Sequence, residues 1–230
     1  MYEAVHCHPD GESTAARQAL SAAEYGFDGI VVRNHGDRVA DDLSGVVDEA
    51  DIDVVRGIEV RADDPSRASG LVGNYRSKRT IVAVHGGDPA INRFAVEQPA
   101  VDVLAHPMAG DGDFNHVLAT AAADNGVRIE FALRPVLGDS GGSRVRALRD
   151  LRKLRKLVAD ADAPYVVSAD PRSHLELRAP RELRALGAAI GFDGAAIEEG
   201  LAEWERLAVR NRNRTGESFV ELGVWVEERE

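Results

Sequence analysis

Seven short apolar runs recur along the chain of 230 residues, and they consist mainly of Val, Ile and Ala. Uninterrupted runs of this kind are typical of parallel strands that are covered on both faces. They predict strands at residues 3–8, 29–34, 53–59, 80–85, 101–105, 127–132 and 165–169. The strand starts lie 21 to 38 residues apart, which leaves room for a helix after each strand.

Helix start signals fall between these runs. Ser13 with Gln18 predicts a first helix that ends at Tyr25-Gly26, and Asp64-Pro65, Asp88-Pro89 and Ala179-Pro180 each begin a later one. The alternation predicts an α/β fold, a TIM-type (β/α) barrel with seven clear strands, with a doubly wound open sheet as the alternative. We expect one barrel domain over residues 1–210. Residues 211–230 then form a C-terminal tail that is either mobile or docks on a partner, and residues 219–226 form either a late strand or a docking peptide.

The composition excludes several classes of protein. With 44% hydrophobic and 29% charged residues, a chain of this length can bury a single core without disulfides or a structural metal. The single cysteine, Cys7, excludes an intrachain disulfide and a cysteine-based zinc knuckle. No run approaches the roughly 18 apolar residues of a membrane span, and no basic leader precedes the first strand, so we expect a cytoplasmic protein without membrane contact. Neither a Gly-rich dinucleotide motif nor a Walker motif occurs.

The charged residues are unusual in kind. The formal net charge is −11, and only 3 of the 28 basic residues are lysine. An acidic surface that almost lacks lysine indicates a protein adapted to high salt, where hydrated carboxylates maintain solubility. A GC-rich genome, which favours arginine codons, is the alternative explanation.

The basic residues are concentrated in one block. Residues 128–184 contain 13 basic and 8 acidic side chains, whereas the rest of the chain contains 15 and 31. Within the block, residues 144–158 predict an amphipathic helix whose apolar positions are Val145, Leu148, Leu151, Leu154, Leu157 and Val158. Its solvent side carries Arg144, Arg149, Arg152, Lys153, Arg155 and Lys156. A charged run is usually only a solvated face, but in so acidic a chain it indicates a phosphate-rich or acidic partner. A second basic cluster comprises Arg206, Arg210, Arg212 and Arg214.

Five of the seven histidines fall at or just after the end of a predicted strand: His6, His8, His35, His85 and His106. The carboxyl ends of barrel strands form the rim on which active sites are built. His6 and His8, two apart on a strand, are expected to point the same way. The candidate ligands for Zn²⁺, Mn²⁺ or Fe are His6, His8, His35, Glu59, His106 and Asp170. The alternative is a hydrogen-bonded polar network without metal; we interpret His116 and His174 as surface residues.

One motif set resembles the polymerase and histidinol phosphatase (PHP) family of metal-dependent barrels. It comprises His6-x-His8, Arg33-Asn34-His35, Gly57-Ile58-Glu59, Ala105-His106-Pro107 and Ser168-Ala169-Asp170. The resemblance implies a phosphoesterase that holds metal ions with His6, His8, Glu59, His106 and Asp170. The family usually ends this pattern with Asp-x-His, whereas Asp170 is followed here by Pro171-Arg172, with a displaced His174.

A more specific resemblance covers nearly the whole chain. Residues 129–137 (IEFALRPVL), the basic helix and residues 177–191 (LRAPRELRALGAAIG) resemble the archaeal ribonuclease P component 3 family, itself PHP-like. This resemblance implies a protein subunit of an endoribonuclease whose RNA, with Mg²⁺, removes the 5′ leader of precursor tRNA. The subunit would bind the RNA backbone and a small partner protein, meet precursor tRNA through the complex, and not be catalytic alone.

The missing Asp-x-His ending and the basic block both favour the ribonuclease P interpretation over the phosphoesterase. The candidate RNA- or partner-binding residues are Arg134, Arg144, Arg149, Arg152, Lys153, Arg155, Lys156, Arg178 and Arg181. We expect Arg134 to pair with a carboxylate such as Glu59 or Asp170, or to meet RNA phosphate. Only 5% of the residues are aromatic, so base stacking is not expected to be the main mode of RNA binding.

Overall fold

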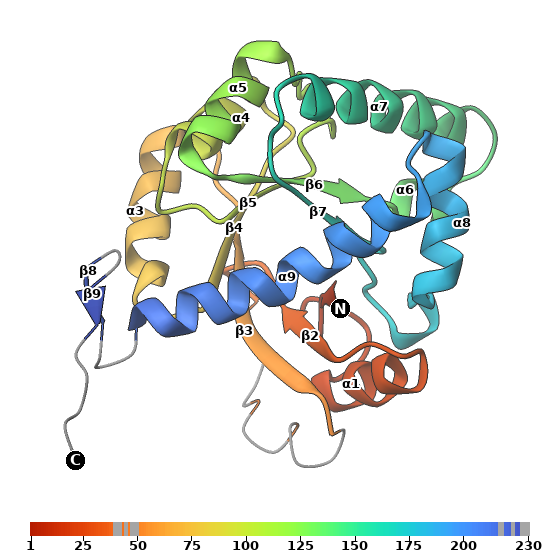
Figure 1. Cartoon of the computed structure of the whole chain (residues 1–230), viewed down its shortest axis with the longest axis horizontal. Helices are drawn as coiled ribbons and strands as arrows, with labels where there is room; N and C mark the ends of the chain where they lie inside the picture. The colour runs from red at the N-terminus through yellow and green to blue at the C-terminus, as the bar shows by residue number, and fades with distance from the viewer. Residues whose placement is uncertain (39–42, 44–45, 47–50, 216–218, 222–223, 226–230) are drawn as a thin grey trace.

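A computed structural model describes residues 1–38, 43, 46, 51–215, 219–221 and 224–225. Seven parallel strands follow one another in sequence order around a nearly closed barrel (Figure 1). They are β1 (Tyr2–Val5), β2 (Gly29–Val32), β3 (Asp53–Val60), β4 (Ile81–His85), β5 (Val103–Ala105), β6 (Arg128–Ala132) and β7 (Tyr165–Ser168). All seven predicted strands are therefore present, and the TIM-type barrel is confirmed over the open sheet.

Helices surround the strands. They are α1 (Ala15–Glu24), α3 (Pro65–Arg76), α4 (Pro89–Glu97), α5 (His116–Asn125), α6 (Arg134–Gly138), α7 (Gly141–Asp160), α8 (Pro180–Ile190) and α9 (Gly194–Thr215), with a 3₁₀ turn, η1 (His174–Glu176), after β7. Asp64 and Asp88 accept hydrogen bonds from backbone N–H groups in the first turns of α3 and α4, as their positions before proline predict. The first helix is capped by Thr14 rather than Ser13, because the Ser13 hydroxyl bonds to His174 instead.

Helix α9 lies across the end of the barrel where the strands begin, and Figure 1 shows it running in front of the strands. Its buried Trp204, Leu207 and Ala208 pack against inward-facing strand residues, among them Val31 and Val166. Cations of α9 pair with carboxylates at the strand starts: Arg210 with Asp102 at 2.8 Å and Arg212 with Asp53 at 2.7 Å. Arg206 pairs with Glu203 within the helix. Two members of the second basic cluster, Arg210 and Arg212, therefore hold α9 against the barrel.

No strand pairing joins β7 to β1 among the described residues, and the seam is bridged by side-chain hydrogen bonds and by the backbone bond from the His6 N–H to the Pro171 carbonyl at 3.0 Å. Glu3 accepts hydrogen bonds from the Ser168 hydroxyl at 2.6 Å and from the Ala169 N–H at 3.1 Å. Trp204 Nε1 donates to the Val167 carbonyl at 2.9 Å. These bonds satisfy backbone groups that an eighth strand would otherwise have paired.

The end of the chain continues the helix beyond residue 210. Helix α9 runs to Thr215, and Asn211 is buried against the barrel. Strands β8 (Phe219–Glu221) and β9 (Val224–Trp225) then form an antiparallel pair, in the region where a late strand was one of the two expectations. The remainder of the expected tail, residues 216–218, 222–223 and 226–230, lies outside the described residues. In the described part of the chain, no helix has the length and apolar character that crossing a bilayer requires.

Candidate functional site

A buried arginine lies at the centre of the barrel. Arg33 follows β2 and is 0% exposed. Its Nη1 donates to Glu59 of β3 at 2.5 Å, and its Nη2 donates to Glu130 of β6 at 2.6 Å and to Asp170, just after β7, at 2.9 Å. Residues an even number of positions apart on a strand face the same way. Arg33 therefore lies on the same inner surface as Val31, and Glu59 on the same inner surface as Val55. On the opposite side, the Arg33 guanidinium lies 5.8 Å from the centre of the Trp204 ring.

Four histidines form an arc above these carboxylates at the rim. Successive ring centres of His6, His35, His85 and His106 lie 5.1, 5.3 and 4.8 Å apart. His106 has φ 50° and Asp170 has φ 54°, both in the left-handed region that favours glycine. This uncommon backbone is found at two of the strand ends that carry site residues, as is frequent at functional sites.

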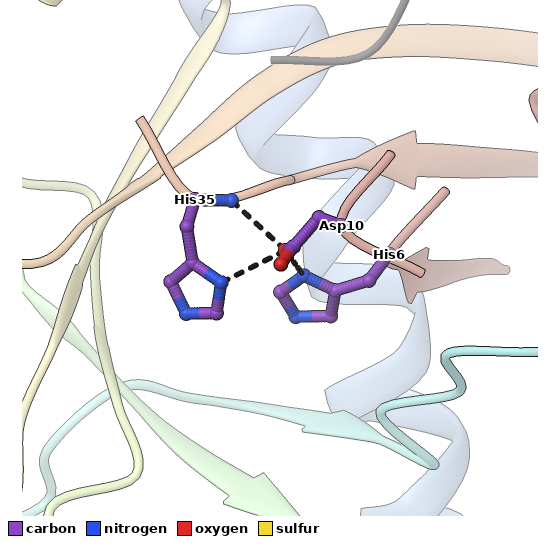
Figure 2. Close-up of side chains that lie close together, drawn as sticks. All are labelled: His6, Asp10 and His35. Carbon is purple, nitrogen blue, oxygen red and sulfur yellow. Dashed lines mark hydrogen bonds and ion pairs between the residues drawn. The ribbon is translucent and has the colours of Figure 1, made fainter. Parts of the chain in front are cut away.

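Asp10 joins two of these histidines (Figure 2). Its Oδ2 lies 2.8 Å from Nδ1 of His6 and 2.8 Å from Nδ1 of His35, and it accepts the His35 backbone N–H at 3.1 Å. Its Oδ1 accepts a hydrogen bond from Arg172 Nη2 at 2.9 Å. Both oxygens of Asp10 are therefore bonded.

The structure brings five of the six candidate metal ligands together: His6, His35, Glu59, His106 and Asp170. The expectation that His8 shares the direction of His6 is wrong, because β1 ends at Val5 and residues 8–10 form a turn that leaves His8 exposed. Asp10 of this turn enters the cluster, and His85 adds a 2.5 Å contact to Glu59.

Sequence reasoning missed Asp10, Arg33 and Glu130 as site residues. For Arg33 and Glu130 there was a signal: each is a charged residue within or directly after an apolar run of a strand covered on both faces. Asp10 gave no such signal, because its position depends on the turn.

The pKa values of the site residues are set by two opposing effects, burial of the charged form and bonding to groups of opposite charge. Burial alone lowers the pKa of His6, but its hydrogen bonds to Asp10 and Asp170 outweigh burial and raise the pKa to about 9. Burial raises the pKa of Glu130 to about 8 despite Arg33. Burial lowers the pKa of His106 to about 4. The pKa values of Asp10, Glu59 and Asp170 are lowered, because the favourable effect of their cationic partners exceeds the effect of burial. At neutral pH the centre thus contains three carboxylates, and His6 and Arg33 are charged.

Two groups of side chains have ligand atoms close enough to hold a metal ion, His6 with Asp10 and His35, and His35 with Glu59 and His85. Their chemistry suits Zn²⁺, Mn²⁺ or Fe. The complete cluster does not fit such ions, however, because it already contains two cations. Arg33 bonds to Glu59, Glu130 and Asp170, and Arg172 bonds to Asp10, so an ion on the remaining oxygens would lie beside a guanidinium of like charge. Arg172 stands two residues after Asp170, where the PHP pattern has a histidine.

The cations of α7 lie in different surroundings. Arg149 is 71% exposed and lies 3.0 Å from the carboxylate of Asp150, and Lys153 pairs with Asp113 at 2.8 Å. Arg152 Nη2 donates to the Ala189 carbonyl at 2.8 Å, and Arg155 packs over the Phe192 ring. Arg144 and Lys156 are exposed and have no hydrogen-bond or ion-pair partner among the described residues.

The predicted apolar face of α7 is only partly buried. Leu151, Leu154 and Val158 are buried, whereas Val145 is 66% exposed because only the later turns of α7 cover the barrel.

Arg134 and Arg178 lie beside the rim. Arg134 forms the expected ion pair, but with Glu176 at 3.5 Å, because Glu59 and Asp170 are bonded to Arg33. Arg178 donates to the carbonyls of Leu175 and Leu177. These two arginines, with His106 and Asp170, line a cavity of about 440 Å³. Arg181 on α8 is exposed and has no hydrogen-bond or ion-pair partner in the part of the chain that the structure describes.

Comparison with known proteins identifies similar sequences over almost the full length. A family model described as RNase P subunit p30 matches residues 1–216. The chain is 65% identical over 229 residues to ribonuclease P protein component 3 of Haloarcula marismortui, covering 99% of this chain and 97% of that protein. It is 37% identical over 227 residues to the protein of the same description from Methanosarcina acetivorans, covering 98% and 95%.

Solved structures agree on the fold. A chain of the cryo-EM structure of archaeal ribonuclease P with mature tRNA superposes with a TM-score of 0.87 at 23% identity, covering 100% of this chain and 99% of that chain. Histidinol phosphate phosphatase from Lactococcus lactis, complexed with zinc, L-histidinol and phosphate, gives a TM-score of 0.54 at 11% identity, covering 97% and 96%. The PHP-like barrel predicted from the sequence is therefore confirmed.

Proposed function

Since the chain belongs to the RNase P subunit p30 family, we propose that it is a protein subunit of ribonuclease P, the endoribonuclease that removes the 5′ leader of precursor tRNA. The observation that carries the proposal is the match along residues 1–216, together with 65% identity to a ribonuclease P protein component 3 over 229 residues. Both extend over the barrel, α7 and α8, so they include every segment on which the sequence resemblance rested.

The chain would support the RNA through the outer side of α7. Arg144, Arg149 and Lys156 are exposed there, and Arg181 on the neighbouring α8 is exposed as well. Arginine and lysine contacts to phosphates position an RNA without reading its sequence. The partners in this proposal are the ribonuclease P RNA, the other protein subunits, in particular a small partner subunit, and precursor tRNA through the complex. Arg152, Lys153, Arg155 and Arg178 belong to the same candidate set but also make contacts within the chain.

Catalysis in this proposal belongs to the RNA and its Mg²⁺, and the isolated chain is not catalytic. The alternative, a metal-dependent phosphoesterase, needs carboxylates that are available to metal ions. In this barrel those carboxylates already have Arg33 and Arg172 as their cations, next to which a metal ion would be repelled. We therefore place no resident Zn²⁺, Mn²⁺ or Fe in the functional site.

The acidic composition outside the basic block is suited to a protein that functions at high salt. Similar proteins occur in Haloarcula marismortui and Natronomonas pharaonis. We propose that the chain acts in the cytoplasm, together with its RNA. At high ionic strength the phosphate contacts of α7 are weakened, so several of them would have to act together.

Reconstitution tests the proposal. Ribonuclease P RNA and the other protein subunits are combined with precursor tRNA at constant ionic strength, with and without this chain. We expect 5′-leader cleavage at lower Mg²⁺ concentration, or at a higher rate, when the chain is present. Equal cleavage in its presence and absence over a series of Mg²⁺ concentrations would contradict the proposal, as would phosphoester hydrolysis by the isolated chain with Mn²⁺.

A further inference from the structure

We propose that Arg33 takes the place of a metal ion at the centre of the barrel, so that a permanent internal cation holds together carboxylates that would otherwise require bound metal. This inference concerns how the barrel is held together and does not rest on RNA binding.

The geometry is that of a cation site made of side chains. Three acids from three strands, Glu59, Glu130 and Asp170, approach the two terminal nitrogens of a single guanidinium at 2.5, 2.6 and 2.9 Å. A guanidinium is planar, always charged and presents several donors in a fork, so it can bond several carboxylates at once. Its side chain is 0% exposed, as are those of Glu59 and Glu130. Buried carboxylates are strongly destabilising unless a cation accompanies them.

The guanidinium is also enclosed on its other side. The Trp204 ring of α9 lies 5.8 Å below it, and Trp204 is itself held by the bond from Nε1 to the Val167 carbonyl. An aromatic face attracts a cation, and the attraction increases when water is excluded. The position of Arg33 is therefore determined by the carboxylates above and by α9 below.

A second arginine, Arg172, supplies a cation to the outer part of the cluster, at Asp10. Arg172 donates from Nη2 to Oδ1 and to the backbone carbonyl of Asp10, both at 2.9 Å. Asp10 is the carboxylate shared by His6 and His35, and the three form one of the two groups whose ligand atoms are close enough to hold a metal ion. Two arginines thus occupy the carboxylates on which the inner and outer parts of the cluster depend. Each arginine bonds one oxygen of its carboxylate, Glu59 Oε2 and Asp10 Oδ1, and the closest histidine contacts are to the other oxygen. A divalent ion on that other oxygen of either carboxylate would therefore lie next to a guanidinium of like charge.

The proposal predicts that metal binding appears when Arg33 is removed. Arg33→Ala would leave Glu59, Glu130 and Asp170 without their cation, next to the imidazoles of His6 and His106. Carboxylates and imidazoles together are ligands for Mn²⁺ and Zn²⁺. A metal that binds the folded chain alone raises the melting temperature with its concentration.

The experiment measures metal content and thermal unfolding of the full chain in one salt buffer, with EDTA and with Mn²⁺. We expect less than about 0.1 Mn²⁺ per parent chain, and a parent Tm that is the same in both conditions within about 1 °C. In EDTA, Arg33→Ala should unfold about 10 °C lower than the parent, and Mn²⁺ should restore part of that loss.

The matched control is Arg128→Ala, because Arg128 also forms a partly buried pair, with Glu203 at 2.8 Å, but at the other end of the barrel. Mn²⁺ should not raise its Tm. A parent chain that contains stoichiometric metal and loses stability in EDTA would overturn the proposal, and so would a folded Arg33→Ala chain that neither binds nor responds to Mn²⁺. If Arg33→Ala does not fold in either condition, the metal content and EDTA response of the parent decide alone.

Discussion

The centre of the barrel and the outer side of α7 both gather cations, but they place them in opposite surroundings. Arg33 has no exposed surface and bonds to the carboxyl groups of Glu59, Glu130 and Asp170, whereas Arg149 is 71% exposed and lies beside a single one, that of Asp150. Arg144 and Lys156 have no partner among the described residues. The same type of side chain is therefore structural in one place and available for an anionic partner in the other.

The difference has an energetic consequence. Removing one member of a buried ion pair leaves a charge without compensation, which destabilises the fold by about 3 to 5 kcal/mol. An exposed pair contributes about 0 to 1 kcal/mol, because water and salt screen it. Changes at the centre should thus act on stability, and changes on α7 should act on binding with little effect on stability.

The largest expected effect is a loss of stability that depends on which region an Arg→Met substitution is made in. Arg33→Met should lower the free energy of unfolding by about 3 to 5 kcal/mol, because Glu59 and Asp170 lose their cation. Arg149→Met should change it by less than about 0.5 kcal/mol. Denaturant unfolding of both variants and the parent at one salt concentration provides the measurement. Equal losses in the two variants would show that the contrast between the regions is wrong.

A smaller effect concerns pH and should arise at buried groups of the barrel rather than on α7. Hydrogen bonds to Asp10 and Asp170 outweigh burial and raise the pKa of His6 to about 9, and burial raises the pKa of Glu130 to about 8. Both groups hold a proton in the folded chain at pH values where the unfolded chain has released it. Stability should therefore fall as pH rises from about 6.5 through 9, by on the order of 1 to 3 kcal/mol.

A variant of Glu130 and a control on α7 test whether this pH dependence arises at the centre of the barrel. Glu130→Gln should reduce the fall in stability between about pH 4.5 and 8, since the amide does not titrate, and should leave the contribution of His6 up to about pH 9. The control Asp150→Asn, on α7, should leave the slope of the parent profile unchanged. Stability that is constant or rises over this range in the parent chain would contradict the assignment.

The smallest effect distinguishes two neighbouring cations within α7. Arg152→Ala should lower stability by about 1 kcal/mol, because its guanidinium donates to the Ala189 carbonyl near the end of α8. Lys156→Ala should change stability by less than about 0.5 kcal/mol, since no partner is found for it in the described residues. Thermal unfolding of the two variants provides the comparison, and an equal loss in both would remove the distinction between structural and available cations on this helix.

The strands and most of the rim were predictable from the sequence because they depend on local signals. Parallel strands covered on both faces are continuous apolar runs, and residues at their carboxyl ends must meet at one rim, which brought His6, His35, Glu59, His106 and Asp170 together. The regular helix pattern of α7 was predictable for the same reason. Val145 was assigned wrongly, since periodicity does not reveal where a helix extends past the barrel that it covers.

What the sequence did not reveal depends on contacts between distant residues. Because β1 ends at Val5, the turn that follows leaves His8 exposed and brings Asp10 into the cluster. The alternation of side chains along a strand does not predict the residue at which the strand ends. The burial of Arg33 requires Glu130, 97 residues away, and Trp204 of α9. The role of α9 as a cover over the strand starts rests on pairs such as Arg212 with Asp53, which are 159 residues apart.

RNA binding of a triple variant tests most directly whether the exposed cations of α7 bind the RNA. Arg144→Gln, Arg149→Gln and Lys156→Gln should leave unfolding unchanged but lower the affinity for ribonuclease P RNA and reduce the slope of log affinity against log salt by about 2 to 3. The control carries the same charge change on the exposed Arg17, Arg67 and Arg93 of α1, α3 and α4, and it should keep the parent slope. An α7 variant with the parent's affinity and slope, or a control that loses as much, would contradict the account.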